Sequence, residues 1–256
     1  MTRRAAPLEA LGGVRHGFLT RAGGVSEGAF ASLNCGYGTD DDPARVARNR
    51  AIALDRVGAP DATLCTAYQR HTALCVTVTE PWPDGAGPQV DAMVTDRPGI
   101  ALGVLTADCA PVLLADRARR VIGAAHAGWR GALAGVLEAA VAGMVALGSA
   151  PGDIVAAVGP CIGQGSYEVG AEFRDAFAAA DPANDRYFTV SVRDGHHMFD
   201  LPGYVADRLA ALGLAEVAAV APDTCADAER FFSYRRACLR GERDYGRLIS
   251  IIALTA

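Results

Sequence analysis

The stretch Leu105-Thr-Ala-Asp-Cys-Ala-Pro-Val-Leu-Leu-Ala115 is followed by Asp116-Arg-Ala-Arg119 and then by Arg120-Val-Ile-Gly-Ala-Ala-His-Ala-Gly-Trp-Arg-Gly131. Two apolar runs on either side of a short polar turn are typical of a β-hairpin. We therefore expect paired strands at the centre of the chain, with polar and potentially reactive side chains at the open end of the pair.

The register of this hairpin decides which side chains meet. A turn centred between Arg117 and Ala118 pairs residues whose numbers sum to 235, and Cys109 and His126 are such a pair. They would face each other with Cβ atoms about 5 Å apart. The turn contains no glycine, so nothing prevents a slip of one residue, which would put the two side chains on opposite faces. A thiol beside an imidazole suits metal ligation, a nucleophile with its base, or a plain buried contact.

A third candidate ligand, His71, precedes the strand-like run 74–78. Two histidines and one cysteine would leave a fourth tetrahedral position for water, which is the pattern of catalytic zinc sites. Zinc would lower the pKa of that water to about 7. From spacing alone, a packed cysteine and two ordinary histidines remain the commoner explanation.

Strand signals outnumber helix signals along the chain and are often consecutive, which favours α+β packing over a strict βαβ alternation. Strands are expected at 14–20, 74–79, 91–95, 100–106, 111–115, 121–125, 154–158, 217–221 and 248–254. Helices are expected at 43–57, capped by Asp42, and at 130–147, 171–180 and 202–212. No repeat or convincing linker occurs, so residues 1–256 are expected to form a single domain.

Composition narrows the function. The 256 residues are 51% hydrophobic, yet no apolar run is long enough for a membrane span and no signal peptide is evident. Seven scattered cysteines are typical of reduced thiols, so we expect a soluble cytoplasmic protein. A net charge of −5 without a basic block argues against nucleic-acid binding. The chain contains no lysine, which excludes a Walker-A lysine and a pyridoxal Schiff base.

Short motifs in a fixed order resemble those of the YfiH-like family, also known as DUF152, polyphenol oxidase or laccase domain, peptidoglycan editing factor and purine nucleoside phosphorylase. The match spans residues 14 to 254, and the pairing of ADCxP with HAGWRG is highly specific. The matching segments are His16-Gly-Phe-Leu-Thr-Arg-Ala-Gly-Gly-Val-Ser26, Ser32-Leu-Asn34, Gln69-Arg-His71, Thr106-Ala-Asp-Cys-Ala-Pro111, His126-Ala-Gly-Trp-Arg-Gly131, Gly159-Pro-Cys-Ile162, Tyr167-Glu-Val-Gly170 and Phe231-Phe-Ser-Tyr-Arg-Arg236.

The resemblance implies a four-layer α/β/β/α fold with mixed sheets, similar to a bacterial toxin cysteine-hydrolase domain. It implies a zinc ion, with copper as the alternative, on His71, Cys109 and His126. The implied activity is phosphorolysis of adenosine, inosine and methylthioadenosine to the free base and ribose 1-phosphate, together with adenosine deamination. The expected partners are thus purine nucleosides and phosphate, with neither nucleic acid nor membrane, and the oligomeric state is left open.

Site roles follow from the same motifs. Cys109 and His126 are expected at the catalytic centre, and Asp108 is either a proton carrier or a hydrogen-bond anchor whose strand position turns it to the other face. The substrate-binding candidates are Arg21 and Arg130 for phosphate, Asn34 as a substrate or turn residue, and Tyr167 as a substrate contact or loop anchor. The pair His196-His197 is expected on a solvated loop.

Three departures from the family pattern put substrate contacts in doubt. Gln69-Arg-His-Thr72 replaces the usual Gln-Val-His-Gly, Asp223-Thr-Cys-Ala-Asp227 replaces the usual Cys-Thr segment before FFSYRR, and the tail 236–248 is longer and more charged. Three other functions compete, and one is a non-enzymatic binding module, which a fully occupied four-ligand metal site would support. A metal-free cysteine hydrolase would use Cys109 as nucleophile and His126 as base, acting on a peptidoglycan precursor. A multicopper oxidase needs a ligand set dominated by histidine, and the chain has only five histidines.

Overall fold

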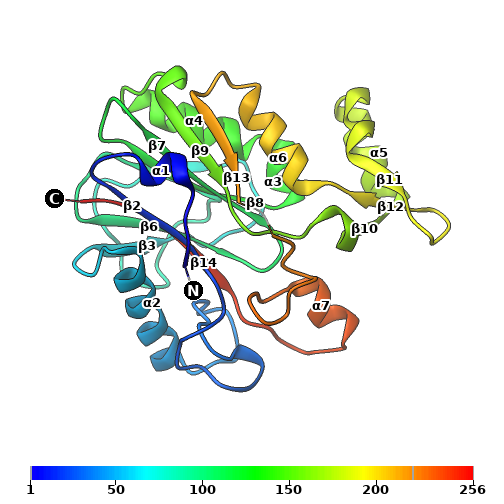
Figure 1. Cartoon of the computed structure of the whole chain (residues 1–256), viewed down its shortest axis with the longest axis horizontal. Helices are drawn as coiled ribbons and strands as arrows, with labels where there is room; N and C mark the ends of the chain where they lie inside the picture. The colour runs from blue at the N-terminus through cyan, green and yellow to red at the C-terminus, as the bar shows by residue number, and fades with distance from the viewer. Residues whose placement is uncertain (1, 221, 256) are drawn as a thin grey trace.

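Two large β-sheets stacked face to face form the centre of the computed structural model, which describes residues 2–220 and 222–255 (Figure 1). The first sheet has five strands, and all neighbours are antiparallel except the last two. Its order is β1 (Thr2–Arg3), β2 (Val14–Leu19), β14 (Leu248–Leu254), β6 (Ile100–Thr106) and β3 (Thr63–Thr66).

The second sheet has six strands and contains the predicted hairpin at its centre. The pairs at its two edges are parallel and the inner pairs are antiparallel, so both sheets are mixed as expected. Its order is β13 (Glu216–Ala219), β9 (Ile154–Val158), β7 (Ala110–Asp116), β8 (Ile122–Ala127), β5 (Ala92–Thr95) and β4 (Cys75–Thr77).

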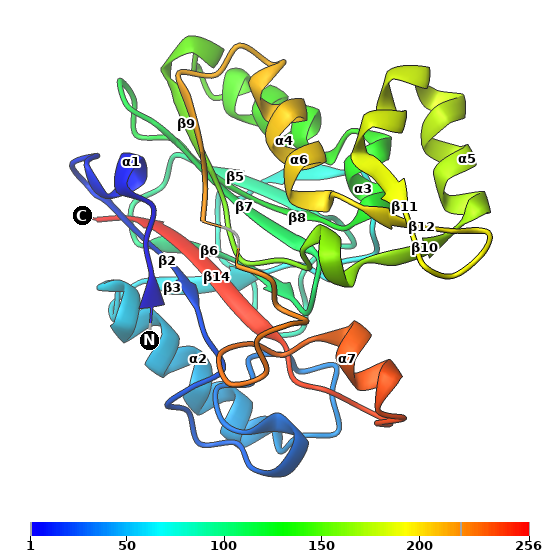
Figure 2. The same ribbon diagram turned by 45° about the vertical axis from the view of Figure 1, so that its right-hand side comes forward.

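Helices cover the outer face of each sheet, which confirms the predicted α+β class and gives four layers in the order α/β/β/α (Figures 1 and 2). Helix α2 (Pro43–Val57) covers the five-stranded sheet. The six-stranded sheet is covered by α3 (Trp129–Ala134), α4 (Val136–Ala146) and α6 (Leu201–Ala210). Apolar side chains on the facing surfaces of the two sheets, such as Leu102 and Leu113, form the core between them.

A smaller lobe projects from one end of the second sheet (Figure 2). It pairs β10 (Glu168–Gly170), β12 (His196–Phe199) and β11 (Phe188–Val190) and packs α5 (Ala171–Ala180) on them. This unit, residues 168–199, is called the side lobe below. Its core is aromatic, and the rings of Phe173 and Phe177 stack with centroids 5.2 Å apart.

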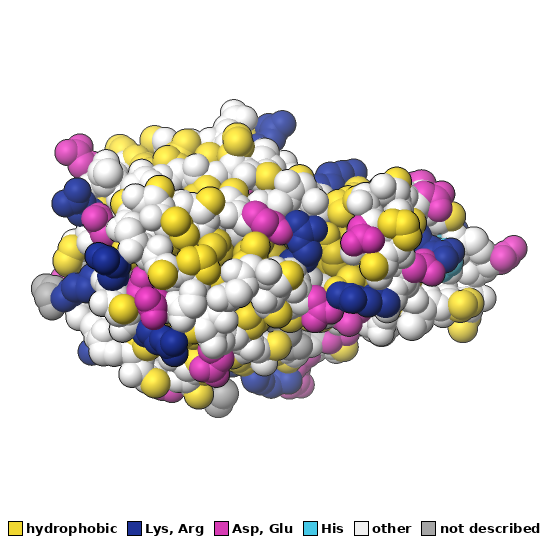
Figure 3. Space-filling view, turned by 90° about the horizontal axis from the view of Figure 1, so that it is seen from above, with side chains coloured by type: hydrophobic (Ala, Val, Ile, Leu, Met, Phe, Trp, Pro, Cys, Tyr) yellow, Lys and Arg dark blue, Asp and Glu magenta, His cyan; other side chains and the backbone are white. Residues whose placement is uncertain are grey.

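Two short helices complete the chain: α1 (Ala6–Glu9) and α7 (Tyr234–Leu239). Single 3-10 turns lie at Gly28–Phe30, Pro151–Asp153, Gln164–Ser166 and Pro182–Tyr187. Among the described residues, no helix has both the length and the apolar character needed to cross a bilayer. In the view over α4, α6 and the side lobe, arginine and acidic side chains are interspersed, with no large patch of one charge (Figure 3).

Several expected elements agree closely with the structure. The predicted cap of α2 is confirmed, because the Asp42 side chain accepts a hydrogen bond from the Ala44 amide at 2.8 Å. The strands expected at 100–106, 154–158 and 248–254 and the helix at 171–180 have the predicted bounds. The strand expected at 217–221 occupies Glu216–Ala219, and Ala221 lies outside the described residues.

Other expectations are corrected. The single helix expected at 130–147 is two helices, because Gly135 adopts a left-handed φ of 103° that an α-helix cannot continue through. The expected elements do not include strands β1 and β3, the three strands of the side lobe, or helices α1 and α7. His196 and His197 begin strand β12 and do not lie on a loop; His197 contacts the ring of Phe188, and His196 lines the cleft described below.

Candidate metal centre

The hairpin of β7 and β8 has a register that differs from the predicted one by two residues. Pro111 pairs with His126 and Ala110 with Ala127, so residue numbers sum to 237 rather than 235. A shift of two residues keeps each side chain on its predicted face. Cys109, directly before β7, is therefore a diagonal neighbour of His126 on the same face.

His71 reaches the same place from the loop before β4. Its backbone has a left-handed φ of 59°, which is uncommon for a non-glycine residue. The Gln69 side chain fastens this loop to β6, because its amide nitrogen donates to the Leu105 carbonyl at 2.7 Å and its oxygen accepts from the Leu105 amide at 2.8 Å. The loop is thus held against the end of the strand that leads into Cys109.

The three predicted ligands come together as one group, called the metal triad below: His71, Cys109 and His126. Their donor atoms lie within 4.8 Å of one another, and Cys109 Sγ lies 3.6 Å from His71 Nε2. With usual zinc–ligand bond lengths, the edges of a tetrahedral site are roughly 3.3–3.6 Å. The triad therefore lies close to the spacing that zinc requires, although its widest edge is longer. Two imidazoles and one thiolate also have the donor chemistry of a zinc site, so the residues present could hold a metal ion.

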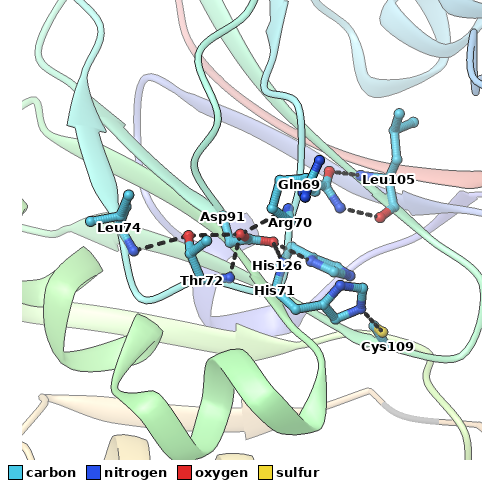
Figure 4. A network of polar contacts seen from close by, with 9 residues as sticks. All are labelled: Gln69, Arg70, His71, Thr72, Leu74, Asp91, Leu105, Cys109 and His126. Carbon is cyan, nitrogen blue, oxygen red and sulfur yellow. Dashed lines mark hydrogen bonds and ion pairs between the residues drawn. The ribbon is translucent and has the colours of Figure 1, made fainter.

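Asp91, a buried residue that precedes β5, organises two of the three ligands (Figure 4). Its Oδ1 lies 2.8 Å from His126 Nδ1 and accepts from the His71 amide at 3.0 Å. Its Oδ2 accepts from the amides of Arg70 at 3.1 Å and Thr72 at 2.7 Å, and from the Thr72 hydroxyl at 2.9 Å. One carboxylate thus holds the His71 loop in its left-handed conformation and directs Nε2 of His126 toward the triad.

The electrostatics of the site shift the pKa values of Cys109 and His126 in opposite directions. Burial alone would raise the pKa of the Cys109 thiol, but the adjacent His126 and His71 imidazoles lower it to about 6. Burial opposes protonation of His126, yet the Cys109 thiolate and Asp91 raise its pKa to about 9. Although burial also acts on Asp91, hydrogen bonds from His126 and the loop amides keep the pKa of its carboxyl well below the usual range. Without metal, the opposite directions of these two pKa shifts favour a thiolate at Cys109 beside a protonated imidazole at His126.

The triad opens into a cleft of about 1680 Å³. One wall is the side lobe, and the opposite walls come from the loop before α2, from α7 and from the segment leading into β14. Two predicted substrate residues line this cleft: Arg130, whose guanidinium lies 4.5 Å from the Trp129 ring centroid, and Tyr167, whose ring packs against Phe173. Their roles as substrate contacts stay predictions.

The structure places Arg21 elsewhere. Its guanidinium donates to the carbonyls of Ala31 at 2.7 Å and Ala228 at 3.1 Å, and it lies over the Phe232 ring. Arg21 is not among the residues that line the cleft. Its predicted contact with phosphate therefore has no support in this geometry.

Asn34 is fully buried and also lies outside the cleft. Its amide nitrogen donates to Thr39 and Asp41, and its oxygen accepts from the amides of Gly36 at 3.1 Å and Arg247 at 2.8 Å. These contacts favour the alternative in which Asn34 shapes a turn.

Asp108 lies in the turn between β6 and β7, with a φ of 89°, and not on a strand as expected. Its carboxylate accepts from the hydroxyls of Thr224 at 2.7 Å and Ser233 at 2.9 Å and from the Arg235 amide at 2.7 Å. Burial raises the pKa of this carboxyl, against the effect of those hydrogen bonds. The geometry favours the role of an anchor that joins the Cys109 turn to the segment carrying α7.

Sequence reasoning missed Asp91, Gln69, Arg235 and Arg247. Asp91 was expected only as the first residue of a strand. Its hydrogen-bond partners lie in two separate segments of the chain, so no local pattern indicated its role. Gln69 lies in the Gln69-Arg-His71 motif, which by itself indicates no role for its side chain. The two arginines of the FFSYRR motif could have indicated a cleft residue. Arg236 donates to the carbonyls of Thr224 and Cys225, whereas Arg235 lines the cleft.

Comparison with known proteins agrees with the motifs. A family model described as multi-copper polyphenol oxidoreductase laccase matches residues 15–255. A Streptomyces griseus protein named purine nucleoside phosphorylase is 41% identical over 252 residues, which cover 98% of each chain. The Escherichia coli protein named purine nucleoside phosphorylase YfiH is 35% identical over 92% of this chain and 91% of the relative. A crystal structure of a DUF152 protein from Neisseria meningitidis is similar at a TM-score of 0.86 and 35% identity, covering 100% of this chain and 99% of that chain.

Proposed function

Because this chain belongs to the laccase-like family that includes YfiH and the DUF152 proteins, we propose that it is a zinc-dependent purine nucleoside phosphorylase. The proposed reaction converts adenosine, inosine or methylthioadenosine and phosphate to the free base and ribose 1-phosphate. Deamination of adenosine is the proposed second activity of the same site. The observation that carries the proposal is the metal triad, held by Asp91 and opening into a cleft large enough for a nucleoside and phosphate together.

The residues of the chain have defined tasks in this proposal. His71, Cys109 and His126 would hold the ion, which when bound supplies a Lewis acid beside the substrate. Asp91 keeps the proton of His126 on Nδ1, so that Nε2 is free to act as a ligand. Trp129 and Tyr167 offer aromatic faces to a purine, and guanidinium groups in the cleft offer paired donors to phosphate.

The ligands present support zinc over a multicopper centre. A blue-copper site with a trinuclear cluster needs a set dominated by histidine. Of the five histidines, two belong to the triad, and His16 is buried where its Nε2 accepts from the Ala5 amide. Among the described residues, the triad is the only group of three or more such side chains close enough to share an ion.

The first prediction concerns Cys109→Ala. We expect wild-type protein, given zinc, adenosine and phosphate, to form adenine and ribose 1-phosphate, with inosine as a second product, as measured by chromatography. Losing a ligand should reduce turnover at least about 100-fold, more than the loss typical of changes around a ligand. Cys75→Ala is the matched control, because Cys75 is a partly buried thiol on β4 outside the cleft. Unchanged adenosine with folded, zinc-loaded wild-type protein would exclude the proposed activity.

One observation supports a second candidate, a metal-free cysteine hydrolase. Cys109, His126 and Asp91 lie in the order of a nucleophile, a base and an orienting carboxylate, as in Cys–His–Asp triads. In this alternative Cys109 attacks a substrate such as a peptidoglycan precursor, and no metal takes part.

Alkylation separates the two candidates. A ligating thiolate is protected while metal is bound, whereas a nucleophilic thiolate stays reactive. We expect iodoacetamide to modify Cys109 slowly in zinc-loaded protein and at least about 10-fold faster after chelation, as followed by mass spectrometry of the Cys109 peptide. Exposed Cys238 is the internal control, because its rate should not respond to zinc. Equal rates for Cys109 with and without zinc would favour the hydrolase.

A further inference from the structure

Arginines outnumber acidic residues by five to three among the residues that line the cleft, although the chain as a whole has a net charge of −5. The acidic side chains that line it are Asp108, which is engaged in hydrogen bonds, and Glu168 and Glu172 of the side lobe. The arginines that line it are Arg50, Arg130, Arg193, Arg235 and Arg247. Arg50 pairs with Asp84 at 2.7 Å, whereas the other four have no ion pair with any carboxylate of the described residues.

Arg247 is the most firmly mounted of these four. It directly precedes β14, the central strand of the five-stranded sheet. Its amide donates to Asn34 Oδ1 at 2.8 Å, and its carbonyl accepts from the Cys35 amide at 3.1 Å. A Cβ atom added at Gly36 would lie 2.6 Å from Arg247 Cγ, so the Ser-Leu-Asn-Cys-Gly segment is shaped around this side chain. The family motif at Asn34 thus acts on the cleft through Arg247.

The head group of Arg247 is held flat and left largely unpaired. Its guanidinium carbon lies 3.5 Å from the Tyr245 ring centroid, and Nη1 donates to the Tyr245 carbonyl. The remaining N–H groups have no acceptor among the described residues. Burial lowers the pKa of Arg247, while the charges of Tyr245, Asp244 and Cys109 oppose that shift. Arg247 lines the same cleft as the metal triad.

A partly buried cation that forms no ion pair is unfavourable, and part of that cost is recovered when an anion binds. A planar guanidinium with free, fixed donors is suited to two oxygens of a phosphate group. Other arginines support the same preference: Arg235 lies 5.5 Å from the Tyr167 ring centroid and, like Arg130, has no carboxylate partner among the described residues. The local charge therefore favours an anionic ligand beside the triad.

We propose that Arg247 is the side chain that binds a phosphate group in the cleft, either as inorganic phosphate or as the phosphate of a nucleotide. This inference rests on the proposed function for the use of the site. It goes beyond that function by assigning the phosphate to Arg247, which neither spacing nor motif indicated, in place of Arg21.

Direct binding tests the proposal without any reaction. Zinc-loaded protein is titrated with inorganic phosphate, and separately with adenosine 5′-monophosphate, by isothermal calorimetry at constant ionic strength. For Arg247→Gln we expect the dissociation constant of the ligand that binds wild type to rise about 10- to 100-fold, the range for losing hydrogen bonds to a charged group. The dissociation constant of Arg247→Lys should lie between those of wild type and Arg247→Gln, because lysine keeps the positive charge but lacks the paired donors of the guanidinium group. Arg48→Gln, at an exposed site on α2, is the charge-matched control.

The two ligands identify the source of the phosphate. Arg247-dependent binding of inorganic phosphate supports the phosphorolysis substrate, and Arg247-dependent binding of the monophosphate alone assigns the subsite to a nucleotide. Folding of each variant is checked by thermal denaturation, and Arg247→Lys carries the test where Arg247→Gln does not fold. Equal phosphate affinities of wild type and a folded Arg247 variant, or no phosphate-group binding by wild type, would overturn the proposal.

Kinetics then separate this inference from the proposed function. We expect Arg247→Gln to raise the KM for phosphate about 10- to 100-fold, whereas Arg48→Gln should leave that KM unchanged. Phosphorolysis by Arg247→Gln with an unaltered KM for phosphate would reject the role of Arg247 in phosphate binding, while the proposed phosphorylase activity would still hold. Arg247-dependent phosphate binding without any phosphorolysis would support Arg247 as the phosphate-binding residue and reject the phosphorylase activity.

Discussion

Asp91→Ala is expected to lower zinc affinity by at least 10- to 100-fold, the range for removing the partner of a ligating histidine. The effect should reach the upper end, because the same carboxylate also holds the loop that carries His71. Without it, three backbone amides and the Nδ1 proton of His126 lose their acceptor in a buried place. The free energy of unfolding should fall by about 3–5 kcal/mol, as when one partner of a buried charged pair is removed.

The measurement is zinc competition against a chromophoric chelator, with thermal denaturation run on the same samples. Asp116→Ala is the matched control, because Asp116 is a buried carboxylate at the other end of the same hairpin. It accepts from the amides of Ala118 at 2.7 Å and Arg119 at 2.8 Å, so its loss should reduce stability and leave zinc affinity unchanged. If folded Asp91→Ala bound zinc as tightly as wild type, His71 and His126 would not need this carboxylate to hold their positions as ligands.

The metal triad could be predicted because local sequence already limits it. The motifs supplied its three members, and the hairpin put Cys109 and His126 on one face even though the register was displaced. The displacement arises at the turn, which occupies residues 117–120 and not 116–119 as expected. Asp116 is the last residue of β7, and its side chain accepts from the amides of Ala118 and Arg119 within the turn. An aspartate at the end of a strand is a known turn signal, so this part of the geometry was accessible from sequence.

The support of the triad could not be predicted, because it depends on contacts between distant segments. Asp91 joins a loop at residues 70–72 to strand β8, and no local pattern distinguishes it from an ordinary residue at the start of a strand. Arg247 is fixed by Asn34, 213 positions earlier in the chain. Hydrophobic periodicity reports which face of an element is buried, and it carries no information on such polar contacts.

At the break between α3 and α4, the helix-forming composition of the segment led to the prediction of one helix, although Gly135 was a local signal for a break. The Ala-rich and Leu-rich segment 130–147 has high helix propensity, which favoured one continuous helix. Gly135, in its left-handed conformation, ends the short helix that follows Gly128 and lets α4 turn to pack on β5 and β8. The short helix is needed because the chain must leave β8 directly beside the triad, where space is restricted.

That restriction gives the second large prediction. A methyl group added at Gly128 would lie 2.5 Å from His71 Cδ2 and 3.0 Å from Cys109 Sγ, closer than side chains pack. Gly128 has an ordinary φ of −71°, so alanine meets no backbone strain there and the conflict is wholly with the two ligands. We expect Gly128→Ala to lower zinc affinity about 100-fold or more, beyond the usual effect of changes around a ligand. Overpacking should cost only about 1–3 kcal/mol of stability.

Gly135→Ala provides the reverse case and makes the prediction specific. Gly135 lies seven positions further on and has a φ of 103°, at which alanine is strained. A Cβ atom added there would have Oε2 of the flexible Glu138 side chain as its nearest neighbour, at 3.5 Å. This variant should lose about 1–2 kcal/mol of stability, the cost of a left-handed residue, and bind zinc like wild type. If both variants lose stability and neither loses zinc, His71 and Cys109 can move apart without releasing the ion, and Gly128 is then required for the turn into α3 rather than for the metal triad.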